Sequence, residues 1–182
     1  LIAFGLLAIY SSTINHPNVS GNFEKQLTFF LISLIVFFIV YLVPTNTIKY
    51  LSIPAYLAGI FFLVVVLVIG KEVSGQKSWL DFGILGFQPS EFAKIGTILG
   101  IAYYLSRNNI DINSFKDLGI TLFLGLVPVA LILLEPDLGS AIVYFGLILA
   151  MVFWKGISLF SLFVVLSPGI VAFSAIFGLY PF

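Results

Sequence analysis

The sequence predicts an all-α, polytopic membrane protein. Two observations support this prediction, the amino-acid composition and the length of the apolar runs. Of its 182 residues, 60% are hydrophobic and only 9% are charged, and the mean hydropathy is +1.17. An ordinary soluble domain does not have this composition. The apolar runs are also too long for barrel strands, so bundled helices must satisfy the backbone hydrogen bonds in lipid.

Seven runs with little or no charge are long enough to be complete or partial membrane spans. A helix needs about 20 residues to cross the bilayer, and polar, turn-rich segments separate the runs. We expect them to form a single transmembrane domain over residues 1–182. Both chain ends lie in apolar sequence, so we expect truncation at each end. The predicted spans are residues 1–13, 26–43, 50–70, 89–106, 118–134, 138–154 and 157–179.

The orientation in the membrane follows weakly from the positively charged loop residues. If the first span starts in the cytoplasm, four loop cations lie inside and three outside, which favours this choice under the positive-inside rule. The loop around Trp79 and the link Glu135–Asp137 would then both face outward. The inside cations are Lys49, Arg107, Lys116 and Lys155, and the outside ones are Lys25, Lys71 and Lys77.

Several classes of function are excluded by composition. The net charge is zero with eight Lys plus Arg, so there is no basic field for nucleic acid. Cysteine is absent and His16 is the only histidine, which excludes disulfides, thiolate catalysis and His-rich or Cys-based metal sites. The sequence also lacks a phosphate-cradling glycine loop, a nucleophile elbow and a zinc signature.

Glu91 and Lys94 are the main candidate site residues, because ionisable groups at membrane depth usually serve a function. Pro89 fits the first turn of a helix, which places Glu91 where the helix dipole favours an anion. Three residues apart, the two side chains share one helical face. They could bind a polar head group, with Lys94 as a point charge for phosphate, or they could simply neutralise each other and hold helices together.

Three other side chains have both a functional and a structural interpretation. Asp137 could be a metal ligand or a partner of Lys94, or it could complement the dipole of the helix it starts. Trp79, in an ordered interfacial loop over 75–83, could face a sugar or lipid, or serve as a membrane anchor. Asp81 in the same loop likewise has both a functional and a structural interpretation. Glu135 we expect to be a loop charge at the end of a span.

The motifs 75–83, GQKSWLDFG, 87–94, FQPSEFAK, and 135–141, EPDLGSA, resemble the SEDS family, the shape, elongation, division and sporulation membrane proteins that include RodA, FtsW and SpoVE. Their order and their placement relative to the spans agree over roughly residues 1–180. At 89–91 the chain has Pro-Ser-Glu, where the FtsW branch commonly has Pro-Ala-Glu. The chain therefore resembles the RodA branch more than the FtsW branch. The resemblance implies a ten-span fold, of which this chain holds seven.

The resemblance further implies a peptidoglycan glycosyltransferase that polymerises lipid II at the outer face of the bacterial cytoplasmic membrane, in cell-wall synthesis for cell shape, elongation or division. It implies that Glu91, Lys94 and Asp137 line a central cavity and Trp79 the outer loop. It also implies Mg²⁺ or Mn²⁺ as cofactor, a class B penicillin-binding protein (the transpeptidase) as partner, and other proteins of the elongation or division complex. The metal ligands stay unassigned.

The catalytic base also stays unassigned. In the family it is an aspartate of the outer loop after the seventh span, which would lie beyond Phe182, so we expect this stretch alone to be inactive. A lipid II flippase remains the alternative, because a polar cavity in a helix bundle also suits transport. A scaffold that recruits a partner is a third hypothesis.

Overall fold

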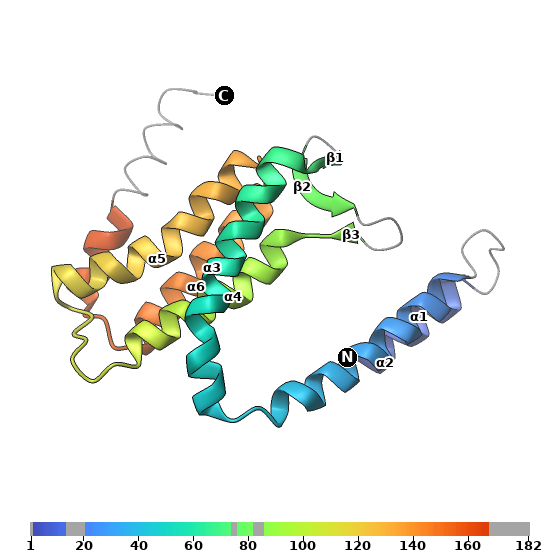
Figure 1. Cartoon of the computed structure of the whole chain (residues 1–182), viewed down its shortest axis with the longest axis horizontal. Helices are drawn as coiled ribbons and strands as arrows, with labels where there is room; N and C mark the ends of the chain where they lie inside the picture. Colours follow the sequence, from blue (N-terminus) through green and yellow to red (C-terminus); the bar gives the residue numbers. More distant parts are fainter. Residues whose placement is uncertain (1, 14–20, 74–75, 82–85, 168–182) are drawn as a thin grey trace. The chain divides into compact units, whose positions relative to one another are not determined.

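The computed structural model describes residues 2–13, 21–73, 76–81 and 86–167, which form helices and one small sheet (Figure 1). The chain divides into two compact units, Leu1–Thr47 and Ile48–Phe182, and each is described by itself. The expectation of a single domain over residues 1–182 stays a prediction.

The first unit contains α1 (Ile2–Thr13) and α2 (Gly21–Tyr41). The two helices are in contact, and the rings of Tyr10 and Phe23 meet edge to face with centroids 5.2 Å apart. The helix α2 begins five residues before the predicted span, because its first turn includes Glu24, where the helix dipole favours an anion. None of the residues in its span is buried within the described structure.

The second unit is a bundle of helices at the positions that the apolar runs predict. They are α3 (Thr45–Ile69), which begins at the boundary of the units, α4 (Pro89–Leu105), α5 (Phe115–Leu134) and α6 (Leu138–Trp154), followed by a helical segment at 159–167. In the described part of the chain, α2, α3 and α5 are long and apolar enough to cross a membrane, and α6 is a shorter apolar helix. The polytopic membrane class is confirmed. The rest of the predicted seventh span lies outside the described residues.

A small antiparallel sheet connects α3 to α4, where we predicted an ordered loop. Its strands are β1 (Lys71–Val73), β2 (Gln76–Asp81) and β3 (Gly86–Phe87), in the order β1-β2-β3. Lys71 pairs with Trp79, and Leu80 pairs with Phe87. The Phe87 ring contacts the rings of Phe62 in α3 and Phe92 in α4 at centroid distances of 5.7 and 6.3 Å. These contacts fix the sheet to the bundle.

Small residues allow α3 and α4 to pack closely, as transmembrane helices commonly do. A Cβ on Gly96 would lie only 2.5 Å from the carbonyl oxygen of Ala55, and one on Gly59 would lie 2.8 Å from the Cα of Ala93. The hydroxyl of Tyr56 donates to the carbonyl of Leu124, at 2.9 Å, and connects α3 to α5. The unit is therefore held by close backbone approach and by a partly buried hydrogen bond between helices.

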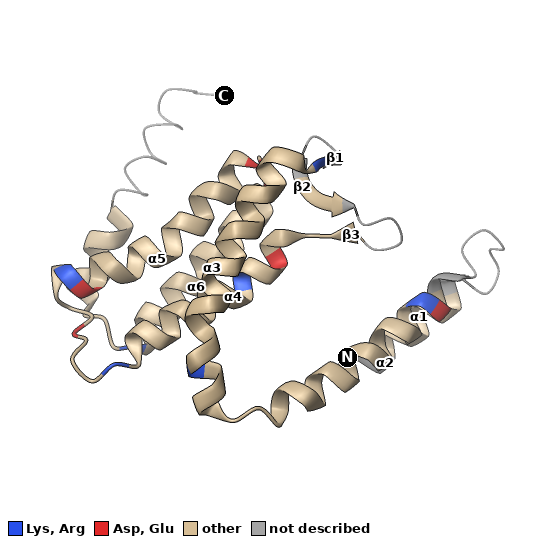
Figure 2. Cartoon of the chain, in the orientation of Figure 1, with Lys and Arg blue, Asp and Glu red and all other residues tan. Residues whose placement is uncertain are grey.

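The bundle has two ends of different charge, and Figure 2 shows charges gathered at both. The "sheet end" comprises β1–β3, the start of α4 and the link between α5 and α6. The "loop end" comprises the part of α3 around Lys49, the α4–α5 connection and the end of α6, where Lys155 donates to the carbonyl of Leu105 at 2.7 Å. The loop end carries Lys49, Arg107, Lys116 and Lys155 against Asp111 and Asp117. The sheet end carries three basic residues, Lys71, Lys77 and Lys94, so a count of four against three favours a cytoplasmic loop end under the positive-inside rule.

Candidate functional site

The start of α4 has the geometry that its sequence predicts. Gln88 is the N-cap residue in an extended conformation, and Pro89 occupies the first turn, where its missing N–H removes no helical hydrogen bond. The side chain of Gln88 does not cap the helix. Its amide instead donates to a carboxylate oxygen of Asp137, at 3.4 Å. The two sequence motifs are thus brought together at the sheet end.

Glu91 and Lys94 form an ion pair on the first turns of α4, as predicted. The Nζ of Lys94 lies 2.7 Å from Oε1 of Glu91. The Lys94 side chain is 20% exposed, while that of Glu91 is 60% exposed. An ammonium has three N–H donors, so the bond to Glu91 leaves Lys94 with capacity to bind an anion. The ion pair is partly buried but still accessible from outside the bundle. This suits ligand binding better than a pair of charges that is fully buried in the core.

Asp137 is the N-cap of α6 and the centre of a local hydrogen-bond network. Its Oδ1 accepts from the backbone N–H of Ser140 at 3.0 Å, and its Oδ2 accepts from the Ser140 hydroxyl at 2.6 Å. Only 6% of the residue is exposed. Both the cap and the contact with Gln88 are therefore present. Lys94 pairs with Glu91, so the proposed Asp137–Lys94 contact is not the one that the structure forms.

Glu135 lies in the turn at the end of α5, as predicted, but it is not an exposed loop charge. The residue is 0% exposed, and neither oxygen of its carboxyl group has a hydrogen-bond partner. Burial, and secondarily the negative charge of Asp137, raise the pKa of Glu135 to about 7. Burial disfavours a carboxylate without a partner, so near neutral pH this site contains a carboxyl group that can hold or release a proton.

Buried groups that we did not identify from the sequence join α6 to α4. The hydroxyl of Tyr144 donates to the carbonyl of Ser90 at 2.6 Å, and Tyr144 is 1% exposed. The hydroxyl oxygens of Ser90 and Ser78 are buried without a partner. The available signal was the spacing, because Tyr144 lies seven residues after Asp137 and hence on nearly the same face of α6.

Trp79 lies in β2 with 37% of its surface exposed. Its ring covers Gly86 on the neighbouring strand, where a Cβ would lie 3.1 Å from the ring. The strand contacts α4, so Trp79 belongs to the sheet end, but it has no hydrogen bond or ring contact with Glu91, Lys94 or Asp137 in the described structure. The side chain of Asp81 lies outside the described residues.

The described residues do not by themselves build a site for Mg²⁺ or Mn²⁺. Among them, no three Asp, Glu or His side chains gather closely enough to hold a metal ion. The carboxylate of Asp137 already accepts three hydrogen bonds, and that of Glu135 is fully buried. Mg²⁺ is usually held by one or two carboxylates together with waters and substrate phosphates, and these two carboxyl groups are not open to it.

Comparisons with known proteins connect this arrangement to a family. The family model FtsW/RodA/SpoVE, described as cell cycle protein, matches residues 1–180. The peptidoglycan glycosyltransferase RodA of Treponema pallidum is 34% identical over 185 residues, covering 100% of this chain and 42% of the relative. The probable peptidoglycan glycosyltransferase FtsW of Buchnera aphidicola is 31% identical, covering 79% of this chain and 41% of the relative.

Two solved structures have a similar fold. A chain of a peptidoglycan synthase complex, studied for the coordination of polymerization and crosslinking, matches with a TM-score of 0.84 and 29% identity, covering 99% of this chain and 52% of that one. A mutant of the rod shape determining protein RodA of Thermus thermophilus matches with a TM-score of 0.78 and 30% identity, covering 92% and 54%. The chain thus spans about half the length of the proteins it matches.

Proposed function

The chain belongs to the FtsW/RodA/SpoVE family of cell cycle proteins, and from this premise we propose that it is part of a peptidoglycan glycosyltransferase. The complete enzyme polymerises lipid II at the outer face of the bacterial cytoplasmic membrane, in cell-wall synthesis. This stretch contributes a wall of the substrate site at the sheet end of α3–α6. Two relatives named as peptidoglycan glycosyltransferases support the activity.

One structural observation carries the assignment of the site. The Gln88 side chain reaches Asp137, 49 residues further along the chain, so the motifs at 87–94 and 135–141 meet at the sheet end. The Glu91–Lys94 pair lies on the first turns of the same helix. Charged groups in an apolar helix bundle usually pair with one another or belong to a functional site. A lipid-linked substrate has a matching form, with an anionic diphosphate next to an apolar tail.

The reaction requires two kinds of group. A base must accept the proton of the attacking sugar hydroxyl, and a cation must stabilise the charge that develops on the diphosphate leaving group. Lys94 suits the second role, because it has N–H donors to spare and binds phosphate as a point charge. Asp137, held by Ser140 and Gln88, positions the start of α6 beside α4. The base stays unassigned.

We assign Glu91 and Trp79 supporting roles in the proposed site. Glu91 holds the Lys94 ammonium at 2.7 Å and so fixes where the cation lies. Trp79 presents an exposed ring on the sheet, a surface of the kind that stacks against sugars or rests at the membrane interface. A class B penicillin-binding protein, other elongation or division proteins and Mg²⁺ or Mn²⁺ belong to this proposal as partners and cofactor.

A polymerisation assay on the complete gene product, purified with its transpeptidase partner, tests the proposal. Lipid II and a divalent cation are supplied in detergent, and glycan strands are separated by length. We expect strands longer than the starting disaccharide. If labelled lipid II instead moves between the leaflets of vesicles and no polymer forms, the protein is a flippase and the proposal is wrong.

A further inference from the structure

A groove between α4 and α6 at the loop end has no place in the proposed site. It has a volume of about 540 Å³, within the range of roughly 300–1,000 Å³ that is typical of ligand pockets. On α4 it begins at Ile98 and continues to Ser106 at the end of the helix, a length of about 12 Å at 1.5 Å per residue. Its apolar walls include Ile98, Ala102, Leu105, Leu147, Ala150 and Met151.

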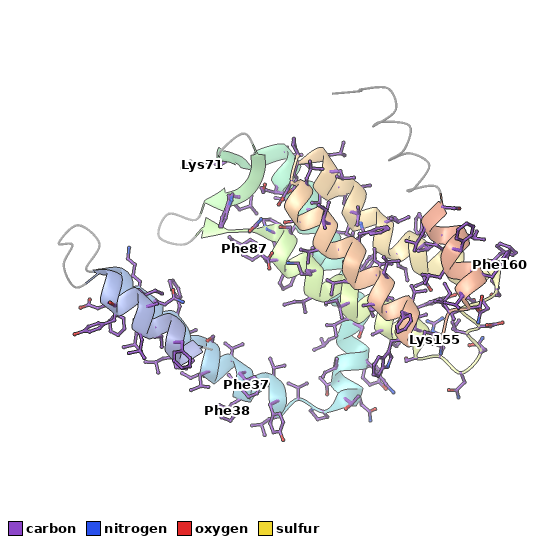
Figure 3. All side chains as sticks on the ribbon, turned by 180° about the vertical axis from the view of Figure 1, so that it is seen from behind. Phe37, Phe38, Lys71, Phe87, Lys155 and Phe160 are labelled. Carbon is purple, nitrogen blue, oxygen red and sulfur yellow. The ribbon has the colours of Figure 1, made fainter. Side chains whose placement is uncertain are left out.

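The polar residues of the groove lie at its mouth. Trp154 and Lys155 line it at the end of α6, and Trp154 is 91% exposed. Lys155 is the only charged residue among those that line the groove, and one of its N–H groups donates to the carbonyl of Leu105. The other two N–H donors of the ammonium are available to a ligand. Figure 3 shows Lys155 and Phe160 at the opposite end of the bundle from Lys71 and Phe87.

We propose that this groove binds one phospholipid of the cytoplasmic leaflet with an anionic head group. One acyl chain lies between α4 and α6, over Ala102 and Ala150, and the phosphate lies beside Lys155. The proposal rests on the membrane location of the helices and does not depend on the proposed function.

Charge and position favour an anionic lipid. The loop end carries four basic residues against two acidic ones in the second unit, and the positive-inside rule favours its placement in the cytoplasm. The cytoplasmic leaflet contains anionic lipids, and basic pockets between transmembrane helices bind their head groups. Exposed tryptophan at a helix end, as at Trp154, marks the depth of the head groups. The groove therefore runs from head-group level toward the bilayer centre.

The shape of the groove suits an acyl chain. An acyl chain is narrow and can pack along the gap that Ala102 and Ala150 leave, because their side chains are small. An acyl chain needs no polar partner, and the residues that line the groove are apolar as far as Ser106 and Lys155 at its mouth.

Native mass spectrometry of the complete protein in detergent tests the proposal. The protein is mixed with equal amounts of phosphatidylglycerol and phosphatidylcholine, and bound lipids are counted. We expect one tightly retained phosphatidylglycerol. Lys155→Gln should lower the preference for phosphatidylglycerol over phosphatidylcholine by roughly fivefold, because a single basic residue contributes about this much at a lipid surface.

Two further variants make the result specific to the groove. Lys116→Gln removes a cation of the same end that does not line the groove, and it should lower the preference much less than Lys155→Gln does. Ala150→Phe fills the groove from an exposed position and should remove the retained lipid. An equal loss of preference in Lys116→Gln and Lys155→Gln overturns the proposal, as does a retained lipid in Ala150→Phe. Absence of any retained lipid in the unmodified protein, as when a protein segment covers the groove, also overturns it.

Discussion

The side chain of Gln88 donates to Asp137 across 3.4 Å, and this single contact joins the residue before α4 to the residue before α6. The Asp137 carboxylate therefore has two roles, because it binds Gln88 and also caps α6 through Ser140. Substitutions at position 137 can separate these roles, since asparagine and aspartate are about equally good N-caps.

Asp137→Asn should keep most of the thermal stability and lower polymerisation. Its side-chain oxygen can still accept the Ser140 N–H, but its amide nitrogen cannot accept the hydrogen bond that Gln88 donates to Oδ2. Asp137→Ala should lower both, with a loss of about 0.5–2 kcal/mol from the missing cap. Thermal unfolding in detergent and the polymerisation assay measure the two effects. Equal stability of the Asn and Ala variants would show that the cap is not important here.

Glu135 should make stability depend on pH. Its pKa is raised to about 7, from a usual value of 4.5, so the folded protein holds this proton to a higher pH than the unfolded chain does. The contribution of Glu135 to stability is therefore greatest below about pH 4.5, falls as the pH rises toward 7, and is level above that. The fall is at most about 3 kcal/mol for this shift.

Glu135→Gln removes the titrating group and should remove this part of the pH dependence. The measurement is the midpoint of thermal unfolding in detergent between pH 4.5 and 8, for both proteins. Parallel curves for the variant and the unmodified protein would mean that Glu135 does not titrate in this range.

The close approach of α3 and α4 should not tolerate a larger residue at position 96. A Cβ there would meet the backbone of Ala55 at 2.5 Å, so Gly96→Ala must push the helices apart and should destabilise by about 1–3 kcal/mol. Gly119→Ala is the matched control, because nothing lies within 4 Å of its Cβ. It should be neutral or slightly stabilising. Similar unfolding midpoints for the two variants would count against the packing described for α3 and α4.

The buried hydroxyl of Tyr144 should contribute measurably to stability. Tyr144→Phe removes its hydrogen bond to the Ser90 carbonyl and should destabilise by about 0.5–1.5 kcal/mol. Tyr50→Phe serves as control, because Tyr50 is 83% exposed. The unfolding midpoint should fall for the first variant alone, and a fall of the same size for Tyr50→Phe would contradict the importance of this bond.

The helices of this protein could be predicted from its sequence because each long apolar run must be buried in lipid or in the protein core, where a helix satisfies its backbone hydrogen bonds. The Glu91–Lys94 pair followed in the same way from the spacing of three residues on one helix. The sheet could not be predicted, since β1 has 3 residues and β3 has 2, too few to show an alternating pattern. Local signals also could not reveal the contact of Gln88 with Asp137 or the burial of Glu135, because both depend on how helices distant in the sequence pack.

The central claim is that Lys94, at the sheet end, binds the anionic part of a lipid-linked substrate. The most direct test compares Lys94→Ala with Lys49→Ala, a cation at the loop end, in the complete protein with its partner and lipid II. We predict that Lys94→Ala lowers the polymerisation rate at least about tenfold, as loss of a charge-stabilising donor does, while its expression and unfolding midpoint match those of Lys49→Ala. A folded Lys94→Ala protein that polymerises lipid II as fast as the Lys49→Ala control would contradict the account.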